Sequence, residues 1–286
     1  MDKNAYFYTL PPRIGAEICA ILKKRERDVS EISEIRLRKL GTSSVYLDRT
    51  RYPLFSTVTE EELSKTLERL SSESLYSHLD TLRDGYLSYF GGVRVGVAGV
   101  GRYDGDRLYS FGEISSLVYR IPSVETVDVS ALSKIFSRAA RGLLIFAPVG
   151  CGKTTALRSL MRELSYGREG LETVALDERF EFSAIDRRGC NLDLISGYKK
   201  ERAIEIALRS LSPRLIVMDE LSGERECLSL LEFMRGGTKI IATVHASEIE
   251  DLKTKNGVSA LLNMGIFDKI VGIEIINGQR TYREYD

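Results

Sequence analysis

The chain has 286 residues, of which 43% are hydrophobic and 29% charged, a size that predicts two globular domains with separate cores. Its 41 basic and 41 acidic side chains balance, which argues against a general affinity for nucleic acid, although a local basic patch stays open. No apolar run reaches the roughly 18 residues of a membrane-spanning helix and no secretory signal is evident, so we expect a soluble, cytoplasmic protein without membrane insertion of its own.

The cysteine pattern argues against a zinc site and against a disulfide framework. The four cysteines lie far apart in the sequence and form neither a CxxC motif nor a cluster with histidine. We therefore expect reduced thiols at Cys19, Cys151, Cys190 and Cys227.

The first region, to about residue 122, mixes helical and strand patterns. Apolar residues recur at helical spacing over 14–22, and a capping box of Thr59 and Glu62 opens a second helix. Valines alternate with other residues over 93–97, which predicts a half-buried strand, and the glycine within 103–107 predicts a hairpin turn. We expect a small α+β domain over residues 1–126.

From about Val127 the pattern changes to short apolar or β-branched runs separated by helical segments. This alternation predicts a parallel sheet with helices on both faces, over residues 127–286. No Pro/Gly/Ser-rich linker marks the boundary, which we place within 122–130. The expected strands are 143–146, 173–176, 215–218, 239–244 and 270–276.

The first of these strands leads into a phosphate-binding loop and then a helix, the context that a P-loop requires. Small residues allow backbone N–H groups to converge on the β-phosphate, and the helix adds its positive end. Lys153 would neutralise the β- and γ-phosphates, and the Thr154 hydroxyl would ligate Mg²⁺. Ala147 takes the place of the first glycine of the motif. We expect ATP to contact Pro148, Val149, Gly150, Cys151, Gly152, Lys153, Thr154 and Thr155.

A second strand, 215–218, ends in the carboxylates Asp219 and Glu220. At the sheet edge where ligands bind, Asp219 would hold Mg²⁺ through water, and Glu220 would orient or deprotonate the attacking water. A strand that merely ends in solvated acids is the alternative, and the phosphate loop makes it the weaker one.

Two further groups follow strand ends beside the same crevice. Glu178, in the sequence Asp177-Glu178-Arg179, would share water activation or lie in the second shell of the metal, with a charged turn as the alternative. His245 would sense the nucleotide state, unless it is a surface or structural histidine. His78 lies in a polar helical stretch, and we expect no role for it.

The order of these motifs resembles the type II/type IV secretion ATPase superfamily, whose members build hexameric rings that drive secretion or pilus machines. More narrowly, the chain resembles the stage III sporulation protein AA family of endospore-forming bacteria over nearly its whole length. In that family Ile-Gly follows the Asp-Glu pair, where this chain has Leu221 and Ser222, and the segment 187–200 diverges from the usual family loop. The matching stretches are 10–14, 34–38, 82–86, 91–99, 209–213 and 217–220.

This resemblance implies a homo-hexameric ATPase that uses ATP and Mg²⁺ to drive a membrane channel built with other sporulation proteins, peripheral at the inner face of the membrane. Related rings supply an arginine from the N-terminal domain of a neighbouring subunit to the γ-phosphate. Alternation places two candidates on one face of a short strand, opposite Ile35 and Leu37. A solvated charged face is the alternative for each. The candidates are Arg36, Arg38, Arg94 and Arg120.

Two other functions share the same core. A nucleic-acid-dependent ATPase would need a basic groove that bears aromatic side chains, and the balanced charge weighs against it. A nucleotide-gated scaffold would bind ATP with little turnover, and Glu220 argues against it because a pure binder has no need of that carboxylate.

Overall fold

A computed structural model describes residues 5–48, 50–71, 85–89, 92–105, 107–122, 125–183, 185–221, 223–233, 237–276 and 278–285. The chain divides into two compact units, Met1–Val124 and Glu125–Asp286, and the expected division after residue 126 falls just inside the second unit. His78, residues 82–84, Gly91 and Ser222, which the sequence analysis names, lie outside the described residues. Within the described ranges no helix combines the length and the apolar character that crossing a membrane requires.

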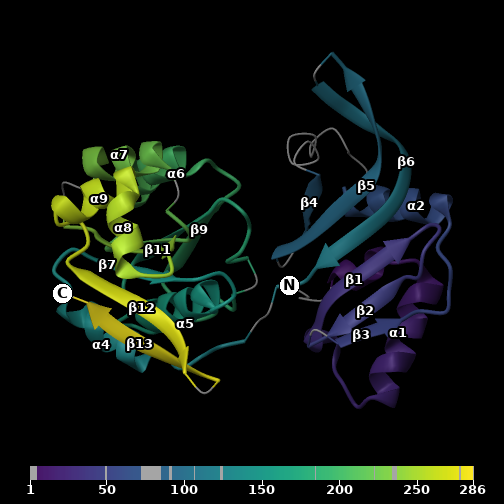
Figure 1. The fold of residues 1–286 in the computed structure, drawn as a ribbon, viewed down its shortest axis with the longest axis horizontal. Coiled ribbons are helices and arrows are strands. Elements are labelled where there is room, and N and C mark those ends of the chain that lie inside the picture. The colour runs from purple at the N-terminus through teal and green to yellow at the C-terminus, as the bar shows by residue number, and fades with distance from the viewer. Residues whose placement is uncertain are drawn as a thin grey trace. The chain divides into compact units, whose positions relative to one another are not determined.

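Figure 1 labels the elements of both units. The helices are α1 (Pro12–Lys24), α2 (Glu60–Leu70), α4 (Ser130–Arg138), α5 (Lys153–Ser165), α6 (Lys200–Ile206), α7 (Glu224–Phe233), α8 (Ile249–Thr254) and α9 (Asn256–Asn263), with a π-helical turn at Ala207–Leu211. The strands are β1 (Ile32–Arg38), β2 (Ser44–Leu47), β3 (Thr50–Pro53), β4 (Tyr86–Tyr89), β5 (Val93–Asp104), β6 (Arg107–Arg120), β7 (Gly142–Ala147), β8 (Thr173–Asp177), β9 (Leu192–Ser196), β10 (Leu215–Met218), β11 (Lys239–His245), β12 (Lys269–Ile276) and β13 (Gln279–Tyr285).

The first unit is an antiparallel sheet with helices α1 and α2, so the expected α+β character is confirmed. Its described strands follow the order β3-β2-β1-β6-β5-β4. The predicted capping box begins α2, because the Thr59 hydroxyl accepts the Glu62 N–H at 3.2 Å and the Glu62 carboxylate accepts the Thr59 N–H at 2.9 Å. Residues Ile14, Ile18 and Leu22 of α1 are buried, as the helical spacing predicts.

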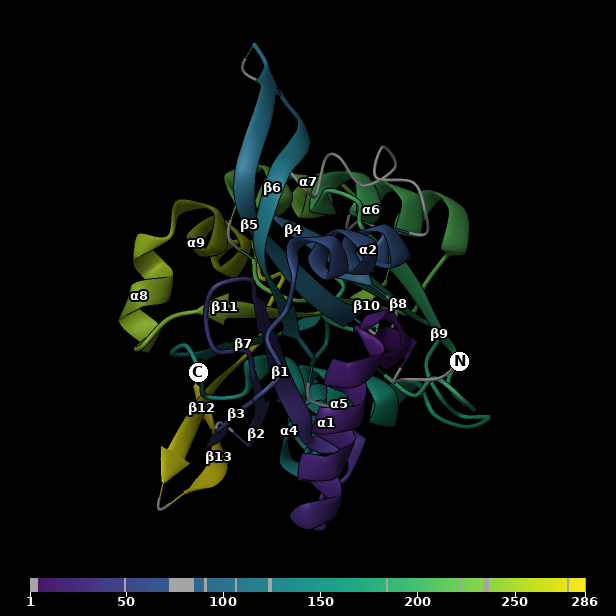
Figure 2. The same cartoon turned by 90° about the vertical axis from the view of Figure 1, so that its right-hand side faces the viewer.

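Strands β5 and β6 form a long hairpin that extends beyond the other strands of this sheet (Figures 1 and 2). Their pairing runs from Arg94 opposite Arg120 to Asp104 opposite Arg107, which confirms the predicted turn. In β1, Ile35 and Leu37 are buried, and Arg36 and Arg38 lie on the other face of the sheet. Arg94 of β5 and Arg120 of β6 line one hollow with Arg36, so basic side chains gather there from neighbouring strands.

The second unit is a sheet with strand order β13-β12-β7-β11-β10-β8-β9 among the described residues. All five predicted strands form, and the register is parallel from β12 through β9. Two strands were not predicted. The first, β9, lies in the segment 187–200 that the sequence analysis describes only as a diverged loop. The second, β13, pairs antiparallel with β12, so the sheet is not wholly parallel.

Both faces of this sheet are covered by helices, which explains the uninterrupted apolar runs of its central strands. In β7, Leu143 and Ile145 pack with helices α4 and α5, whereas Leu144 and Phe146 pack with α6, α7, α8 and α9 (Figure 1). Each such side chain, once buried, contributes about 1.5–3 kcal/mol. The helices on the two faces thus fix the strand ends from which the polar loops leave.

The entry into β7 is held by one carboxylate from the loop before β12. Asp268 accepts the backbone N–H groups of Ala140, Arg141 and Gly142 at 2.7, 2.8 and 2.9 Å. Burial raises the pKa of Asp268, but the three backbone bonds outweigh it and hold the pKa below its usual value. The ionised form of this side chain therefore stabilises the start of the central strand.

We predict that Asp268→Ala lowers the free energy of unfolding by about 1 kcal/mol at pH 7, because three N–H groups lose a charged acceptor that water only partly replaces at this exposed position. A depressed folded pKa stabilises fully above the unfolded pKa of about 4, and the effect is lost as the pH falls through the lower folded pKa. In urea titrations the gap between variant and wild type should therefore narrow as the pH falls below about 4. Asp193→Ala is the control, because that side chain is exposed and lies on β9; a gap that does not narrow with falling pH would contradict the assignment.

Candidate nucleotide-binding and catalytic site

The loop between β7 and α5 needs glycine at two positions. Gly150 and Gly152 have φ values of +84° and +77°, in the left-handed region that glycine favours. The guanidinium of Arg280 also lies against Gly152, since a Cβ atom there would meet Arg280 Nη2 at 2.2 Å. Gly152 is the N-cap of α5 and offers no side-chain bond to the first N–H groups of the helix. These groups remain available to an anion at the helix N-terminus.

Lys153 lies across the start of this loop. Its Nζ donates to the carbonyl oxygens of Ala147 at 2.7 Å and Pro148 at 3.1 Å, and burial lowers its pKa. Ala147 is the last residue of β7 and is buried, so the place of the motif's first glycine has the extended backbone that alanine readily adopts. The lysine charge is thus held within the loop.

Asp219, at the end of β10, joins three elements through two threonines. Its carboxylate accepts the Thr154 hydroxyl of α5 at 3.0 Å and the Thr243 hydroxyl of β11 at 2.7 Å. The oxygen of Thr243 in turn accepts the N–H of Glu220 at 2.9 Å. The predicted metal pair, Thr154 and Asp219, is therefore in direct contact.

Glu220 follows with a backbone that few non-glycine residues adopt, at φ +49°. Its carboxylate forms an ion pair with Arg179 at 3.1 Å, and the two side chains are 41% and 53% exposed. An exposed pair of this kind contributes about 0–1 kcal/mol, so little opposes movement of the carboxylate.

The turn after β8 brings two more carboxylates to the site. Asp177 accepts the N–H groups of Glu181 and Phe182 at 2.6 and 3.0 Å, and burial raises its pKa to about 6. Glu181 lies 3.4 Å from the Thr154 hydroxyl. Burial, followed by the hydrogen bond to Asp219 and the charge of that carboxylate, raises the pKa of Glu181.

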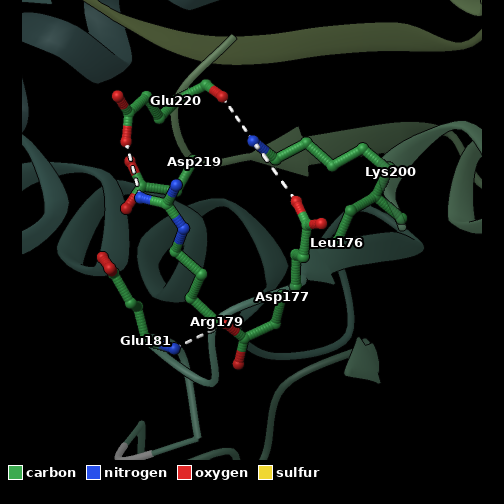
Figure 3. Close-up of a pocket in the computed structure, with 8 residues that line it drawn as sticks. Leu176, Asp177, Arg179, Glu181, Lys200, Asp219 and Glu220 are labelled. Atoms are coloured by element: carbon green, nitrogen blue, oxygen red, sulfur yellow. Dashed lines mark hydrogen bonds and ion pairs between the residues drawn. The ribbon is translucent and has the colours of Figure 1, made fainter. Parts of the chain in front are cut away.

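The Glu178 carboxylate faces Lys200 and not the metal site that its position in the sequence suggests. Its carboxylate lies 3.8 Å from the ammonium of Lys200, the first residue of α6. Figure 3 shows Lys200 directed toward Glu220 on one side of a small pocket and Glu181 on the other. Glu178 therefore belongs to the Lys200 side, and Glu181 to the side of Asp219 and Thr154.

His245 is the last residue of β11, where the parallel register sets it opposite Ala147 at the start of the loop. It is partly exposed. Its role as a sensor of the nucleotide state stays a prediction, and its position beside the start of the loop is consistent with that role.

The candidate arginines of the first unit divide into two groups. Arg36, Arg94 and Arg120 line one hollow of the sheet, where the Arg94 guanidinium lies 4.1 Å from the centre of the Tyr86 ring. Arg38 does not line this hollow and donates to the Thr42 carbonyl oxygen at 2.8 Å. Three of the four predicted arginines are therefore together.

Sequence reasoning passed over three residues of this site: Glu181, Lys200 and Thr243. A hydroxyl within the apolar run of β11 is a signal that would have identified Thr243. Glu181 lies between Phe180 and Phe182 in a turn, and Lys200 begins a helix rich in charge, so neither differs from an ordinary surface residue in sequence.

The chain is similar to known proteins both in sequence and in structure. The family model described as "Sporulation stage III, protein AA" matches residues 9–283. Stage III sporulation protein AA of Bacillus subtilis (strain 168) is 28% identical over 274 residues, which cover 91% of this chain and 89% of that protein. Competence protein ComGA of Streptococcus pneumoniae is 25% identical over 147 residues, which cover 51% of this chain and 44% of ComGA.

Two solved structures share the fold. The pilus retraction motor PilT with bound ADP has a TM-score of 0.67 at 17% identity, covering 94% of this chain and 82% of PilT. The Legionella pneumophila ATPase DotB has a TM-score of 0.66 at 12% identity, covering 93% of this chain and 79% of DotB. The predicted fold, a RecA-like P-loop core preceded by an α+β domain, is confirmed.

We predict that Thr243→Val lowers the free energy of unfolding by about 1–3 kcal/mol, because the buried Glu220 N–H loses its acceptor and Asp219 loses a donor. Thr243→Ser keeps the hydroxyl and loses one methyl group, so it should stay closer to wild type. Urea unfolding of both variants provides the measurement. A serine variant that is less stable than the valine variant would show that packing, and not hydrogen bonding, dominates here.

Proposed function

Because the chain belongs to the family of sporulation stage III protein AA, we propose that it is an ATPase that binds and hydrolyses ATP as the motor of a ring. Proteins that share its fold include the ATPase DotB and the pilus retraction motor PilT. The observation that carries the proposal is the contact between Thr154 and Asp219 at 3.0 Å beside the glycine loop. A hydroxyl from the first turn of α5 and a carboxylate from the end of β10 meet there next to a site for phosphate.

The residues of the loop fit a nucleoside triphosphate bound with Mg²⁺. The uncapped N-terminus of α5 and the Lys153 ammonium would hold the phosphates, because both present positive charge to one place. Thr154 and Asp219 offer the oxygen ligands that Mg²⁺ prefers. The ion supplies neutralisation of phosphate charge when it is bound.

Glu220 is the group that we propose to activate the attacking water. Its backbone is held at a strand end beside the loop, whereas its carboxylate forms an exposed ion pair with Arg179. The carboxylate is therefore able to turn toward water without a large energetic cost. Glu178 remains a proposed second acid, although its contact with Lys200 supports a role in neutralising that lysine.

We propose that one arginine of the hollow formed by Arg36, Arg94 and Arg120 acts in a neighbouring copy of the chain. Three guanidinium groups gathered on one sheet face are suited to the charge of a phosphoryl group in transfer. Arg38 is a weaker candidate because a local carbonyl oxygen holds its guanidinium, and Arg36 is likewise held by an ion pair with Glu34.

The resemblance to this family also suggests a cellular role. We propose a homo-hexameric ring that is cytoplasmic, peripheral at the inner face of the membrane, and that drives a channel of the sporulation apparatus. PilT, which shares the fold and is named as a pilus retraction motor, favours a mechanical function, and the balanced charge weighs against a nucleic-acid-dependent one.

Glu220→Gln should bind ATP as wild type does and hydrolyse it at least about a hundredfold more slowly, because the amide keeps the shape without accepting a proton. Lys153→Ala should lose ATP binding. Binding is measured with a fluorescent ATP analogue and turnover by phosphate release. An unchanged turnover number in Glu220→Gln would move the base to Glu178, and binding without turnover in the wild type would favour the nucleotide-gated scaffold.

Replacing the arginine that acts in the neighbour by alanine should lower turnover by about 10³ to 10⁵ while leaving ATP binding intact. Mixing that variant with Glu220→Gln should restore partial activity, because some interfaces then combine an intact arginine with an intact Glu220. Lys153→Ala mixed with Glu220→Gln is the matched control, since each residue acts in the site of its own subunit and no site becomes complete. Arginine variants at all four positions that hydrolyse ATP like wild type would eliminate the idea.

A further inference from the structure

Lys200 is a buried cation that the proposed reaction does not use. Only 6% of its surface is exposed. Its ammonium donates to the backbone carbonyl oxygen of Glu220 (Figure 3). It also lies 3.8 Å from the Glu178 carboxylate and 3.7 Å from that of Glu226. The three partners come from the end of β8, the end of β10 and the first turn of α7. One side chain thus joins three elements that meet at the pocket.

Burial of an ammonium group costs several kcal/mol unless partners compensate it. Lys200 donates a hydrogen bond to the carbonyl oxygen, and two carboxylates lie within ion-pair distance of its ammonium. An apolar side chain of similar length would fill the same space without that cost. The arrangement is therefore explained by what the lysine holds in place rather than by a gain in packing.

The group that it holds is the backbone of Glu220. This residue has φ +49°, a conformation that costs about 1–2 kcal/mol for a residue with a Cβ atom. Thr243 accepts the Glu220 N–H at 2.9 Å, and Lys200 binds the carbonyl oxygen. Both peptide groups of the strained residue are consequently fixed, and these bonds determine the direction in which its side chain leaves the strand end.

We propose that Lys200 is a positioning residue that holds Glu220 in this backbone conformation, so that the carboxylate is presented to the attacking water. The inference rests on the proposed ATPase function. Lys200 acts through the main chain of Glu220, whereas Arg179 pairs with the carboxylate itself. The exposed ion pair with Arg179 lets the Glu220 side chain move, and the buried contact with Lys200 holds the Glu220 main chain in place.

The test compares Lys200→Met with the exposed neighbour Lys199→Met. Displacement of a reacting group by about 1 Å can cost 10²-fold in rate, so we expect kcat to fall between about ten- and a hundredfold in Lys200→Met. Affinity for the fluorescent ATP analogue should stay within about twofold, because the loop is untouched. Lys199→Met should match wild type in both. Equal kcat values for Lys200→Met and wild type would overturn the proposal.

A double-variant comparison separates positioning from general damage. If Lys200 acts through Glu220, adding Lys200→Met to Glu220→Gln should lower the residual rate little further. Losses that multiply in full would mean that Lys200 acts independently of Glu220, and the proposal would be wrong.

Removal of the lysine alone leaves two acids without their cation, which is able to impair folding. Adding Glu226→Gln to Lys200→Met removes one of these acids and leaves Glu178 in place, and the reference is the wild type. We expect this double variant to be slower than wild type by the same ten- to hundredfold factor. A rate equal to that of wild type would overturn the proposal.

A crystal structure of Lys200→Met gives a readout independent of activity. We expect Glu220 to leave the left-handed region, and a φ that stays near +49° would overturn the inference. A wild-type protein without ATP hydrolysis would overturn the proposed function instead, and the Glu220 backbone would still decide the role of Lys200.

Discussion

The Asp219 carboxylate accepts hydrogen bonds from Thr154 and Thr243, and the rest of the site depends on this pair of contacts. One threonine begins the helix after the glycine loop, and the other lies within a neighbouring strand. Because β7, β11 and β10 run parallel and adjacent, their ends reach the same edge of the sheet. The two bonds then set the loop helix against the acidic strand end. The glycine loop and the carboxylate that we propose to hold Mg²⁺ become one site through them.

Burial divides the charged groups of the crevice into fixed and movable ones. The ammonium of Lys200 and the carboxylate of Asp177 are almost fully enclosed, and their hydrogen bonds hold backbone groups. Arg179 and the Glu220 carboxylate are about half exposed, so water competes for their ion pair. The main chain of the site is thus rigid where the reacting side chain is free to turn. Such a division suits a base that must approach a water molecule in one step and withdraw in another.

Sequence patterns predicted the elements that have strong apolar runs and failed where polar residues form the structure. The runs of β7, β10 and β11 are buried on both faces and gave clear strands. By contrast, β13 has the sequence QRTYREY and is at most partly buried, so it lacks a hydrophobic signal. The contacts of Glu181 with Thr154 and of Lys200 with Glu220 join residues that are distant in the sequence, so no local pattern predicts them. The shared hollow of Arg36, Arg94 and Arg120 depends on strand register, which local alternation does not specify.

The position of β7 between β11 and β12 also has a consequence for how the chain is made. The strand that bears the phosphate loop is synthesised first in its sheet, yet both of its hydrogen-bonding neighbours lie far downstream. Such non-local pairing folds slowly, because long loops must close before the contacts form. Until then an entirely apolar strand has two open edges, which are templates for intermolecular pairing. The first unit closes its own sheet before this strand emerges, so the risk of aggregation during synthesis falls mainly on the second unit.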